Sequence, residues 1–338
     1  MTEVLADLSP EEQARRLLAL AASALENWEL DVERLEPLKV RENAVYAVYL
    51  RCGRRVVLRV HRYGYHTDAA LESEHLWLQA LCASGIEVPR FRATRHGRMF
   101  AQVTVAGLSG PRQVDLLEWI DGLPLGALSE LNVSDTQVER IYGTIGGLAA
   151  AMHNHASGWL KPRGFIRHAW DAEGLVGEQP LWGRFWELGA LSAEQRRLFL
   201  ALRSRLLADL PGYGVASDRF GLIHADLVPE NILITGTGPR IIDFDDGGHG
   251  WHMFELATSL YFIRRERYYE AAREALLAGY RRHRPLPEEH AKMLPLFLAA
   301  RGTTYLGWAH TRRGEPTAVE LTPQLIGLAA AAAADYLA

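Results

Sequence analysis

The sequence has little of what marks secreted, metal-scaffolded or nucleic-acid-binding proteins. Its two cysteines, Cys52 and Cys82, lack metal-ligand spacing, so we expect reduced thiols and neither a disulfide framework nor a cysteine-bound metal. Lys and Arg total 37 against 41 Asp and Glu, a formal net charge of -4 at pH 7. Nucleic-acid binding requires a basic surface, so this balance argues against a nucleic-acid partner. Because both cysteines are expected to be reduced, we also expect a cytoplasmic protein.

Long hydrophobic runs are also missing from both ends of the chain. Acidic residues such as Glu3 and Asp7 stand where a signal peptide would need a basic start and an apolar run. Near the other end, the apolar residues 325–334 are too few to span a bilayer, and they run into Asp335. Their alanine content favours a helix. We expect no export by a signal peptide, no membrane partner, and a terminal helix docked on the protein.

What is present fits a globular enzyme of two lobes. The chain has 338 residues, which is long for one compact core. Residues 33–62 alternate in short apolar runs typical of a strand meander, whereas residues 67–83 have helical spacing. After residues 121–124 the pattern becomes mainly helical. We predict an α+β fold with a small antiparallel sheet in an N-terminal lobe, residues 1–120, and a larger, mainly helical C-terminal lobe, residues 121–338.

Further helices and one irregular stretch complete this prediction. Ser9 can cap a helix that begins at Pro10 and runs to about Glu26, outside the first lobe. Residues 157–183 are rich in Gly, Pro and Trp and suggest a lid or insertion. In the C-terminal lobe, helices are predicted near residues 134–155, 192–210, 251–264, 268–283, 287–312 and 317–337.

The stretch from His224 to Asp243 arranges residues as ATP-dependent phosphoryl transfer requires. Asp226 can accept the proton of an attacking hydroxyl, and Asn231, five residues later, can fold back onto a metal ion. Asp243, at the end of the next apolar strand, can chelate the Mg²⁺ that bridges nucleotide phosphates. We predict His224, Asp226 and Asn231 as catalytic residues and Asn231 and Asp243 as metal ligands. The alternative is a polar loop in which His224 satisfies a backbone group and Asp226 caps a turn.

In the N-terminal lobe, Arg59 is the candidate cation for the α- and β-phosphates. Strand alternation places it on one face with Val57 and His61. Kinases orient such a cation with a carboxylate from the following helix, and Glu74 is the candidate. The alternative is that Arg59 is one of several surface arginines. We therefore assign nucleotide binding to the N-terminal lobe, and catalysis and substrate binding to the C-terminal lobe.

Two further segments of this lobe are candidates for nucleotide contacts. The turn at residues 41–46 would bring backbone N–H groups, and Asn43, near the phosphates, although it contains no glycine and by itself is an ordinary hairpin turn. Near the lobe junction, a strand can offer adenine a carbonyl and an N–H from Glu118 and Ile120, with Leu117 beside the ring. The alternative for this strand is a plain edge strand.

These motifs follow one another in a fixed order: Glu42-Asn43, Leu58-Arg59, Glu74 with Val88-Pro89, Leu117-Glu118 with Asp121-Gly122, Leu148-Ala149 with His153, His224-Ala225-Asp226, Asn231 and Asp243. In this order they resemble the aminoglycoside phosphotransferase and choline kinase family, from about residue 30 to 265. The chain is similar in particular to bacterial members often called homoserine kinase type II or stress-response kinase-like proteins.

The resemblance implies a protein-kinase-like fold, with ATP in a cleft and a small-molecule hydroxyl as the acceptor. It also implies Asp226 as the catalytic base, Asn231 and Asp243 as ligands of Mg²⁺, and Arg59 paired with Glu74 over the phosphates. The sequence departs from the pattern at several places. Many relatives have Lys in place of Arg59, and a guanidinium grips phosphate as a planar fork where an ammonium acts as a point charge.

Other departures bear on which kind of kinase this is. Protein kinases carry Lys where this chain has Val228 and Gly where it has Asp245, and no Ala-Pro-Glu follows here. These differences argue against a conventional protein kinase. The related group often shows Asp-Leu-Ala as support for the catalytic loop, where this chain has Glu255-Leu256-Ala257 with a longer side-chain arm.

Candidate acceptor residues precede and follow the catalytic loop. Four tryptophans and three carboxylates gather there: Trp159, Trp170, Trp182 and Trp186, with Asp171, Asp245 and Asp246. Aromatic faces beside carboxylates suit a cationic acceptor, although the tryptophans can equally cover the core. An amino-acid acceptor also needs a cation for its carboxylate, for which Arg163, Arg167 and Arg301 are available. His249 and His252 are not expected to bind Mg²⁺, which prefers oxygen.

We therefore predict an ATP- and Mg²⁺-dependent kinase of a small-molecule hydroxyl, an amino acid or amino alcohol such as homoserine. A polycationic aminoglycoside is less favoured because the C-terminal lobe has mixed charge, with arginine pairs among its glutamates. Three alternatives stay open: a stress-response-type Ser/Thr protein kinase, an aminoglycoside kinase and a catalytically silent nucleotide-binding module.

Overall fold

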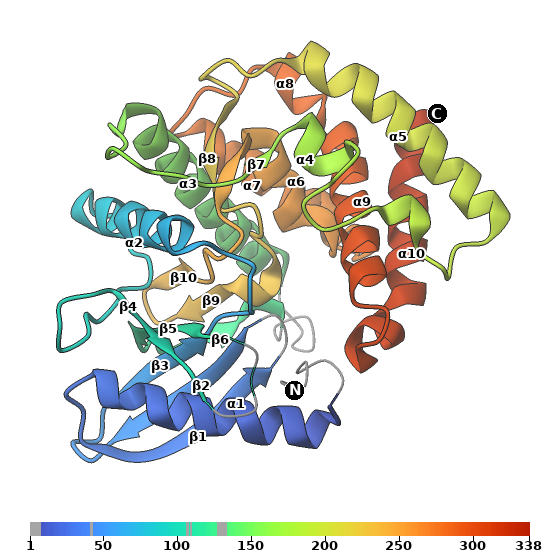
Figure 1. Ribbon diagram of the computed structural model, residues 1–338. Helices are drawn as coiled ribbons and strands as arrows, with labels where there is room; N and C mark the ends of the chain where they lie inside the picture. Colours follow the sequence, from blue (N-terminus) through green and yellow to red (C-terminus); the bar gives the residue numbers. More distant parts are fainter. Residues whose placement is uncertain (1–7, 41–42, 106–107, 109, 127–133) are drawn as a thin grey trace. The chain divides into compact units, whose positions relative to one another are not determined.

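The computed structural model describes residues 8–40, 43–105, 108, 110–126 and 134–338 (Figure 1). The chain forms two compact units. The first comprises Met1–Asp121 with Lys161–Ile166, and the second comprises Gly122–Leu160 with Arg167–Ala338. The short segment 161–166 therefore groups with the first unit, although its place in the sequence assigns it to the C-terminal lobe.

A five-stranded antiparallel sheet forms the centre of the first unit, as the strand meander predicts. Its order is β1-β2-β3-β5-β4. The strands are β1 (Val32–Val40), β2 (Ala44–Leu50), β3 (Arg55–Val60), β4 (Phe100–Val103) and β5 (Arg112–Glu118). In the register of β3 and β5, Arg59 lies opposite Asp115, so two charged residues face each other across neighbouring strands.

Two helices accompany this sheet, and a side-chain hydroxyl caps each of them, at the predicted cap Ser9 and at Thr67. The hydroxyl of Ser9 accepts a hydrogen bond from the Glu12 N–H at the start of α1 (Pro10–Ala24), and the Thr67 hydroxyl accepts one from the Ala70 N–H at the start of α2 (Asp68–Ala83). Apolar residues of α1 join the core under the sheet: Leu17, Leu20, Ala21 and Ala24. This burial holds α1 against the sheet.

The second unit is mainly helical in its described residues, as predicted. Its α-helices are α3 (Asp135–Gly158), α4 (Ala172–Val176), α5 (Ala193–Tyr213), α6 (His252–Tyr261), α7 (Tyr269–Arg281), α8 (Glu288–Ala291), α9 (Leu294–Thr311) and α10 (Pro316–Leu337). The helix predicted over 287–312 is divided in two, since Pro295 stands in the first turn of α9, where proline is tolerated but cannot continue α8. Residues 169–176, within the predicted lid, form β7 and α4, and Trp170 is fully buried there.

Two small sheets of the second unit carry the loops between the motifs. One has the order β10-β9-β6, with β6 at Leu123–Pro124, β9 at Ile232–Thr235 and β10 at Gly238–Ile241. The other has the order β7-β11-β8, with β7 at Ala169–Trp170, β8 at Phe220–Ile223 and β11 at Gly248–Trp251. Strands β9 and β10 pair as an antiparallel hairpin, which sets Asn231 before one strand and Asp243 after the other.

The last helix, α10, runs beside α9 (Figure 1). By length and composition alone, its 22 residues are apolar enough to cross a membrane. Residues along one side are nevertheless buried in the unit, among them Leu325, Ala329 and Ala333. A Cβ on Gly302 of α9 would lie 3.1 Å from the Cα of Ala329, which shows how closely the two helices approach. These contacts are those of the docked terminal helix that the sequence predicts.

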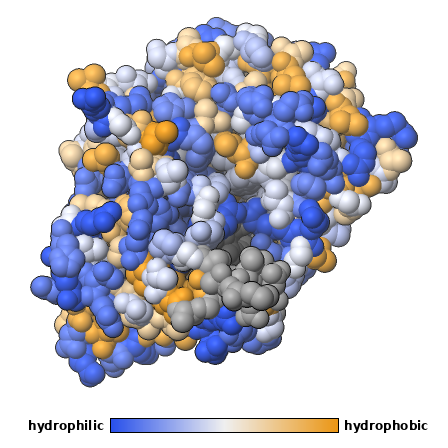
Figure 2. Space-filling model, viewed as in Figure 1, coloured by the Kyte–Doolittle hydropathy of each residue, from blue (hydrophilic) through white to orange (hydrophobic). Residues whose placement is uncertain are grey.

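Exposed hydrophobic side chains occur singly along the sequence. Leu160 and Val215 are examples in the second unit. Figure 2 shows hydrophobic residues scattered among hydrophilic ones on the face that it draws. Such scattered residues are normal on protein surfaces, and the described residues on this face form no extended apolar patch.

Candidate active site

The loop after β8 has an unusual backbone at the predicted catalytic motif. Among the described residues, Ala225 and Asp243 are the two non-glycine residues with positive φ, at 66° and 64°. A side chain in this left-handed conformation is disfavoured, and such strain persists only where the surroundings hold it. One of these residues directly precedes Asp226, and the other is the predicted metal ligand itself.

Glu255, on α6, holds the strained loop from one side. Its carboxylate is fully buried and accepts hydrogen bonds from the backbone N–H groups of His224, at 2.9 Å, and Ala225, at 2.7 Å. Burial raises the pKa of Glu255, and the two N–H donors act in the opposite direction. The longer arm of Glu255 thus reaches the same loop that an Asp supports in similar proteins.

One close neighbour of Glu255, His153, is neutral. His153, on α3, places its Nε2 3.6 Å from a Glu255 oxygen, and its Nδ1 lies 2.9 Å from the Tyr280 hydroxyl. Burial lowers the pKa of His153 to about 3, so its imidazole is uncharged at neutral pH. The carboxylate of Glu255 is therefore held chiefly by backbone donors of the catalytic loop.

His224 links this loop to the segment before Asp243. Its Nδ1 accepts a hydrogen bond from the Asp226 N–H at 3.2 Å, so the proton lies on Nε2, which donates to the Ile242 carbonyl at 2.9 Å. Both ring nitrogens are used within the fold, and the ring is fully buried. His224 therefore helps to hold the catalytic loop in place.

Asp226 and Asn231 form the centre of the site. The Asn231 amide nitrogen donates to the Asp226 side chain at 2.8 Å and to the Asp226 carbonyl at 3.0 Å. The Asn231 carbonyl in turn accepts from the Ile242 N–H at 2.9 Å, next to Asp243. The side chains of Asn231 and Asp243 thus belong to hydrogen-bonded neighbouring segments and offer an amide and a carboxylate oxygen. Oxygen donors of this kind fit Mg²⁺.

Arg301, on α9, is one of two site residues whose place sequence reasoning missed. Its side chain is fully buried, and its Nη2 donates to one carboxylate oxygen of Asp226. The same guanidinium donates to the Ala225 carbonyl at 3.2 Å and to the Tyr305 hydroxyl at 2.7 Å. The sequence offers Arg301 only as one of three possible partners for an acceptor carboxylate. A signal was present, because Arg301 is the single charged residue of α9 before its last turn.

The predicted acceptor residues of the second unit separate into two groups. Trp170 and Trp182 both donate to Asp246, Trp170 to its carbonyl at 2.9 Å and Trp182 to its carboxylate at 3.3 Å. The Trp182 ring also lies edge-on to Tyr305, with centroids 5.7 Å apart. Asp246 and these aromatic rings thus lie on the same side of the second unit as Arg301.

The other candidates are used elsewhere. Trp186 stacks on Arg203, Trp159 stacks on His155, and Asp171 caps α4 by accepting from the Gly174 N–H. Arg167 donates to the carbonyls of the segment that holds Asp245, which lies in the loop after β10. Arg163 belongs to the first unit.

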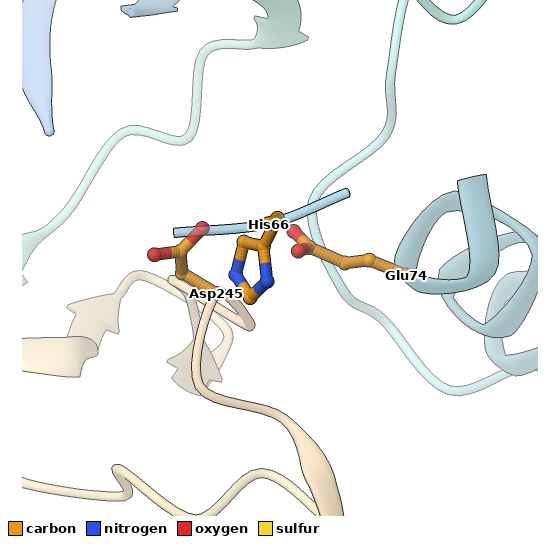
Figure 3. Close-up of side chains that lie close together, drawn as sticks. All are labelled: His66, Glu74 and Asp245. Carbon is orange, nitrogen blue, oxygen red and sulfur yellow. The ribbon is translucent and has the colours of Figure 1, made fainter. Parts of the chain in front are cut away.

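The first unit brings Arg59 and Glu74 together, as predicted. Glu74 projects from α2 (Figure 3), and its carboxylate accepts from Arg59 at 2.8 Å. Sequence reasoning missed Asp115, which takes two hydrogen bonds from Arg59, at 2.8 and 3.1 Å, and lies 2.8 Å from the His61 Nε2. Burial alone would raise the pKa of Asp115, but Arg59 and His61 outweigh it and hold the pKa well below its usual range.

The remaining predicted nucleotide residues also lie in the first unit. The N–H of Glu118 donates to the Arg90 carbonyl at 2.8 Å, and Leu117 lies opposite Val57 on β3. Ile120 follows β5 and is half-buried. The Asn43 side chain accepts from the Arg62 N–H at 3.0 Å, so it fixes one end of the predicted phosphate turn, whose residues 41–42 lie outside the described ranges.

Comparisons with known proteins bear on the family and the fold of this chain. The profile of the phosphotransferase enzyme family matches residues 34–287. The structure of a microcompartment-associated aminopropanol kinase is 32% identical, with a TM-score of 0.83, and the match covers 95% of this chain and 97% of that one. An uncharacterized protein of Deinococcus radiodurans is 30% identical over 275 residues, 78% of this chain and 73% of that protein.

A homoserine kinase of Rhodopseudomonas palustris strain TIE-1 is 29% identical over 230 residues, which cover 66% of this chain and 62% of its own length. This match is shorter than the match to the aminopropanol kinase. Together the comparisons confirm the predicted family and the predicted fold class.

Proposed function

The chain belongs to the phosphotransferase enzyme family, and from this premise we propose that it is an ATP- and Mg²⁺-dependent kinase of a small amino alcohol. The observation that carries the proposal is the state of Asp226. Its carboxylate is partly exposed, is held by Asn231 and Arg301, and follows a strained residue. A carboxylate fixed in this way can orient an acceptor hydroxyl for attack on a phosphoryl group.

In the proposed reaction, Asp226 accepts the proton of the acceptor hydroxyl while the oxygen attacks the γ-phosphorus of ATP. A new oxygen–phosphorus bond forms, the bond to the β-phosphate oxygen breaks, and ADP and a phosphomonoester result. His224 is a positioning residue, because it holds the loop through Ile242. Asn231 and Asp243 would hold Mg²⁺, which neutralises phosphate charge when bound.

We assign nucleotide binding to residues of the first unit. Arg59, oriented by Glu74, is proposed to bind the phosphates, and Asn43 to fix the turn that approaches them. The Glu118 carbonyl and the Ile120 N–H are proposed to bind adenine beside Leu117. The Glu118 N–H already donates to the Arg90 carbonyl, so the proposed contact with adenine uses the Glu118 carbonyl.

The charges near Asp226 favour an amino alcohol over an amino acid. The Arg301 donors already serve Asp226, Ala225 and Tyr305, and Arg167 binds backbone carbonyls. An acceptor carboxylate would therefore compete with the partners that these two arginines already have. Asp246 and the Trp182 ring instead suit an ammonium group. Similarity to the aminopropanol kinase supports the same choice.

Two acceptors that differ by one carboxylate test this choice. 3-Aminopropan-1-ol is homoserine without its carboxylate, so the pair isolates the charge in question. We expect ADP release with Mg²⁺ and ATP to show kcat/KM at least about tenfold higher for the amino alcohol, which corresponds to about 1.4 kcal/mol. Choline, ethanolamine, hydroxylysine and an aminoglycoside complete the screen.

A preference for homoserine would contradict the amino-alcohol assignment and leave the kinase assignment intact. Turnover confined to the aminoglycoside, or phosphorylation of a protein substrate with no small-molecule acceptor, would contradict both the substrate class and the acceptor site. ATP binding with no turnover on any acceptor would indicate a silent nucleotide-binding module.

A further inference from the structure

A cation buried in the second unit contacts the proposed catalytic carboxylate. Arg301 has no exposed side-chain surface, whereas the Asp226 side chain is 20% exposed. Burial of a guanidinium costs several kcal/mol unless partners compensate it, so its partners indicate what it does. Among the described residues, the one carboxylate that Arg301 contacts is that of Asp226, the residue to which we assign the chemistry.

Arg301 also contacts Ala225, whose backbone conformation determines where the Asp226 side chain points. Arg301 donates to the Ala225 carbonyl, and Glu255 accepts from the Ala225 N–H. The strained residue is therefore held at both of its backbone polar groups, by a cation on one side and a carboxylate on the other. A left-handed alanine is maintained only by contacts of this kind.

Both carboxylate oxygens of Asp226 are also engaged. One accepts from Arg301, and the other accepts from the Asn231 amide. Two donors from different segments fix the plane of the carboxylate, since rotation about its side-chain bonds would break one of them. Each oxygen retains a second lone pair for the acceptor hydroxyl.

Tyr305 holds Arg301 in turn. It lies one helical turn further along α9, on the same side, and its hydroxyl accepts from the Arg301 Nη2. The guanidinium carbon lies 4.4 Å from the Tyr305 ring centroid and 4.8 Å from that of Trp182. Although burial alone would lower the pKa of Arg301, Tyr305 and Asp226 raise it above the usual value. The arginine is thus a fixed cation.

We infer that Arg301 and Tyr305 are positioning residues for phosphoryl transfer, which fix the orientation of the Asp226 carboxylate and of the Ala225 peptide before the acceptor binds. This inference rests on the proposed function. It assigns Arg301 to the orientation of the base and not to recognition of an acceptor carboxylate. The loss of Arg301 should therefore lower kcat and leave acceptor binding nearly unchanged.

The test compares Arg301→Gln, Arg301→Lys and Tyr305→Phe with the parent, measuring kcat and KM for ATP and 3-aminopropan-1-ol. A misplaced catalytic group costs on the order of 10²-fold in rate, so we expect about this loss of kcat for Arg301→Gln. The KM values should change by no more than about twofold. Arg301→Lys should recover part of the loss, because an ammonium reaches Asp226 but lacks the planar fork. Tyr305→Phe should lose less than Arg301→Gln.

Arg203→Gln is the matched control. Arg203 also donates to backbone carbonyls, those of Val176 and Gly177, to a carboxylate, that of Glu178, and stacks on a tryptophan, Trp186. It differs from Arg301 in having no partner in the catalytic loop. We expect Arg203→Gln to lower the Tm without lowering kcat.

Chemical rescue separates positioning from a purely structural role. In Arg301→Ala, added guanidinium chloride at millimolar concentration should raise kcat, whereas the same concentration of sodium chloride should not. If Arg301→Gln is poorly folded, Arg301→Lys and Tyr305→Phe still decide the matter through their kcat values.

Three results would overturn the inference. Unchanged kcat in folded Arg301→Lys and Tyr305→Phe would make the pair structural only. A raised acceptor KM at constant kcat would make Arg301 a binding residue. A failure of guanidinium to rescue folded Arg301→Ala would exclude positioning by its charge. Absence of transfer by the parent to any acceptor would be a failure of the proposed function itself.

Discussion

Each unit contains a buried arginine that binds carboxylates, and the two clusters differ in exposure and charge. In the first unit, Arg59 meets Asp115 and Glu74, and both carboxylates are almost completely buried. In the second unit, Arg301 meets one carboxylate, Asp226, which is partly exposed. We call the first cluster closed, because solvent hardly reaches its side chains, and the second open, because the Asp226 carboxylate is accessible to a ligand.

The balance of formal charge differs in the same sense. In the first cluster one arginine faces two carboxylates, and ring nitrogens of His61 and His75 also lie close to Asp115. The second cluster is balanced, and its other acceptors are the neutral oxygens of Ala225 and Tyr305. We infer that the closed cluster stabilises the first unit and fixes the orientation of Arg59, the proposed phosphate-binding cation, whereas the open cluster carries the proposed catalytic carboxylate.

The largest expected effect is at the open cluster. Asp226→Ala removes the group that orients the hydroxyl and takes its proton, and we expect kcat to fall about 10²- to 10⁴-fold. Nucleotide binding should stay nearly unchanged. Steady-state ADP release and nucleotide titration measure the two quantities. Asp335→Ala is the control, because Asp335 lies on the terminal helix, is exposed and pairs with Arg264. Turnover at the parent rate in Asp226→Ala would refute the role of Asp226.

Replacement of Asp243 should cause a different defect from replacement of Asp226, in nucleotide binding. Since it is the proposed carboxylate ligand of Mg²⁺, Asp243→Ala should abolish the Mg²⁺-dependent part of ATP affinity and leave the metal-independent part. Calorimetric titration of ATP with and without Mg²⁺ measures this. Equal Mg²⁺ dependence in the variant and the parent would remove Asp243 from the metal site.

A smaller effect, on stability, is expected at the closed cluster. The pKa of Asp115 is lowered in the folded state, so its contribution is fully present above the unfolded value, near 3.8, and is lost as the pH falls through the lower folded pKa. Removing one partner from a buried ion pair costs about 3 to 5 kcal/mol. We expect Asp115→Asn to lose about 3 kcal/mol of unfolding free energy at pH 7.

The pH dependence makes this prediction specific to Asp115. The difference between the parent and Asp115→Asn, measured by urea unfolding, should be constant from pH 7 to 5 and shrink below about pH 4. Asp121→Asn is the control, because Asp121 is exposed and pairs with Arg55 in the same unit. A difference that does not change with pH down to 3 would mean that the carboxylate charge is not what stabilises the cluster.

The parts of the site that are near one another in sequence were predictable. Asp226, Asn231 and Asp243 occupy one strand–loop–hairpin unit, and spacing along such a unit largely determines how its side chains meet. Arg59 and Glu74 were predictable for a similar reason, because a strand followed by its helix restricts where the two side chains lie. The cap residues Ser9 and Thr67 are also local signals, and both helices begin there.

The parts that depend on distant segments were not predictable. Asp115 is 56 residues from Arg59, and Arg301 is 75 residues from Asp226. Their contacts follow from the register of β3 with β5 and from the packing of α9 against the catalytic loop. Neither is encoded in a local period, and each charged residue had several possible partners in the sequence. The tryptophans before the catalytic loop have different partners for the same reason: Trp170 and Trp182 contact Asp246, whereas Trp159 and Trp186 do not share this site.

The central claim is that ATP phosphorylates the hydroxyl of a small amino alcohol at this site. Phosphorus NMR of the parent protein with Mg²⁺, ATP and 3-aminopropan-1-ol measures it directly. We expect a phosphomonoester signal that grows in step with ADP, and that grows at least about 10²-fold more slowly with Asp226→Ala. ADP accompanied by inorganic phosphate alone, or a phosphomonoester formed equally well by Asp226→Ala, would contradict it.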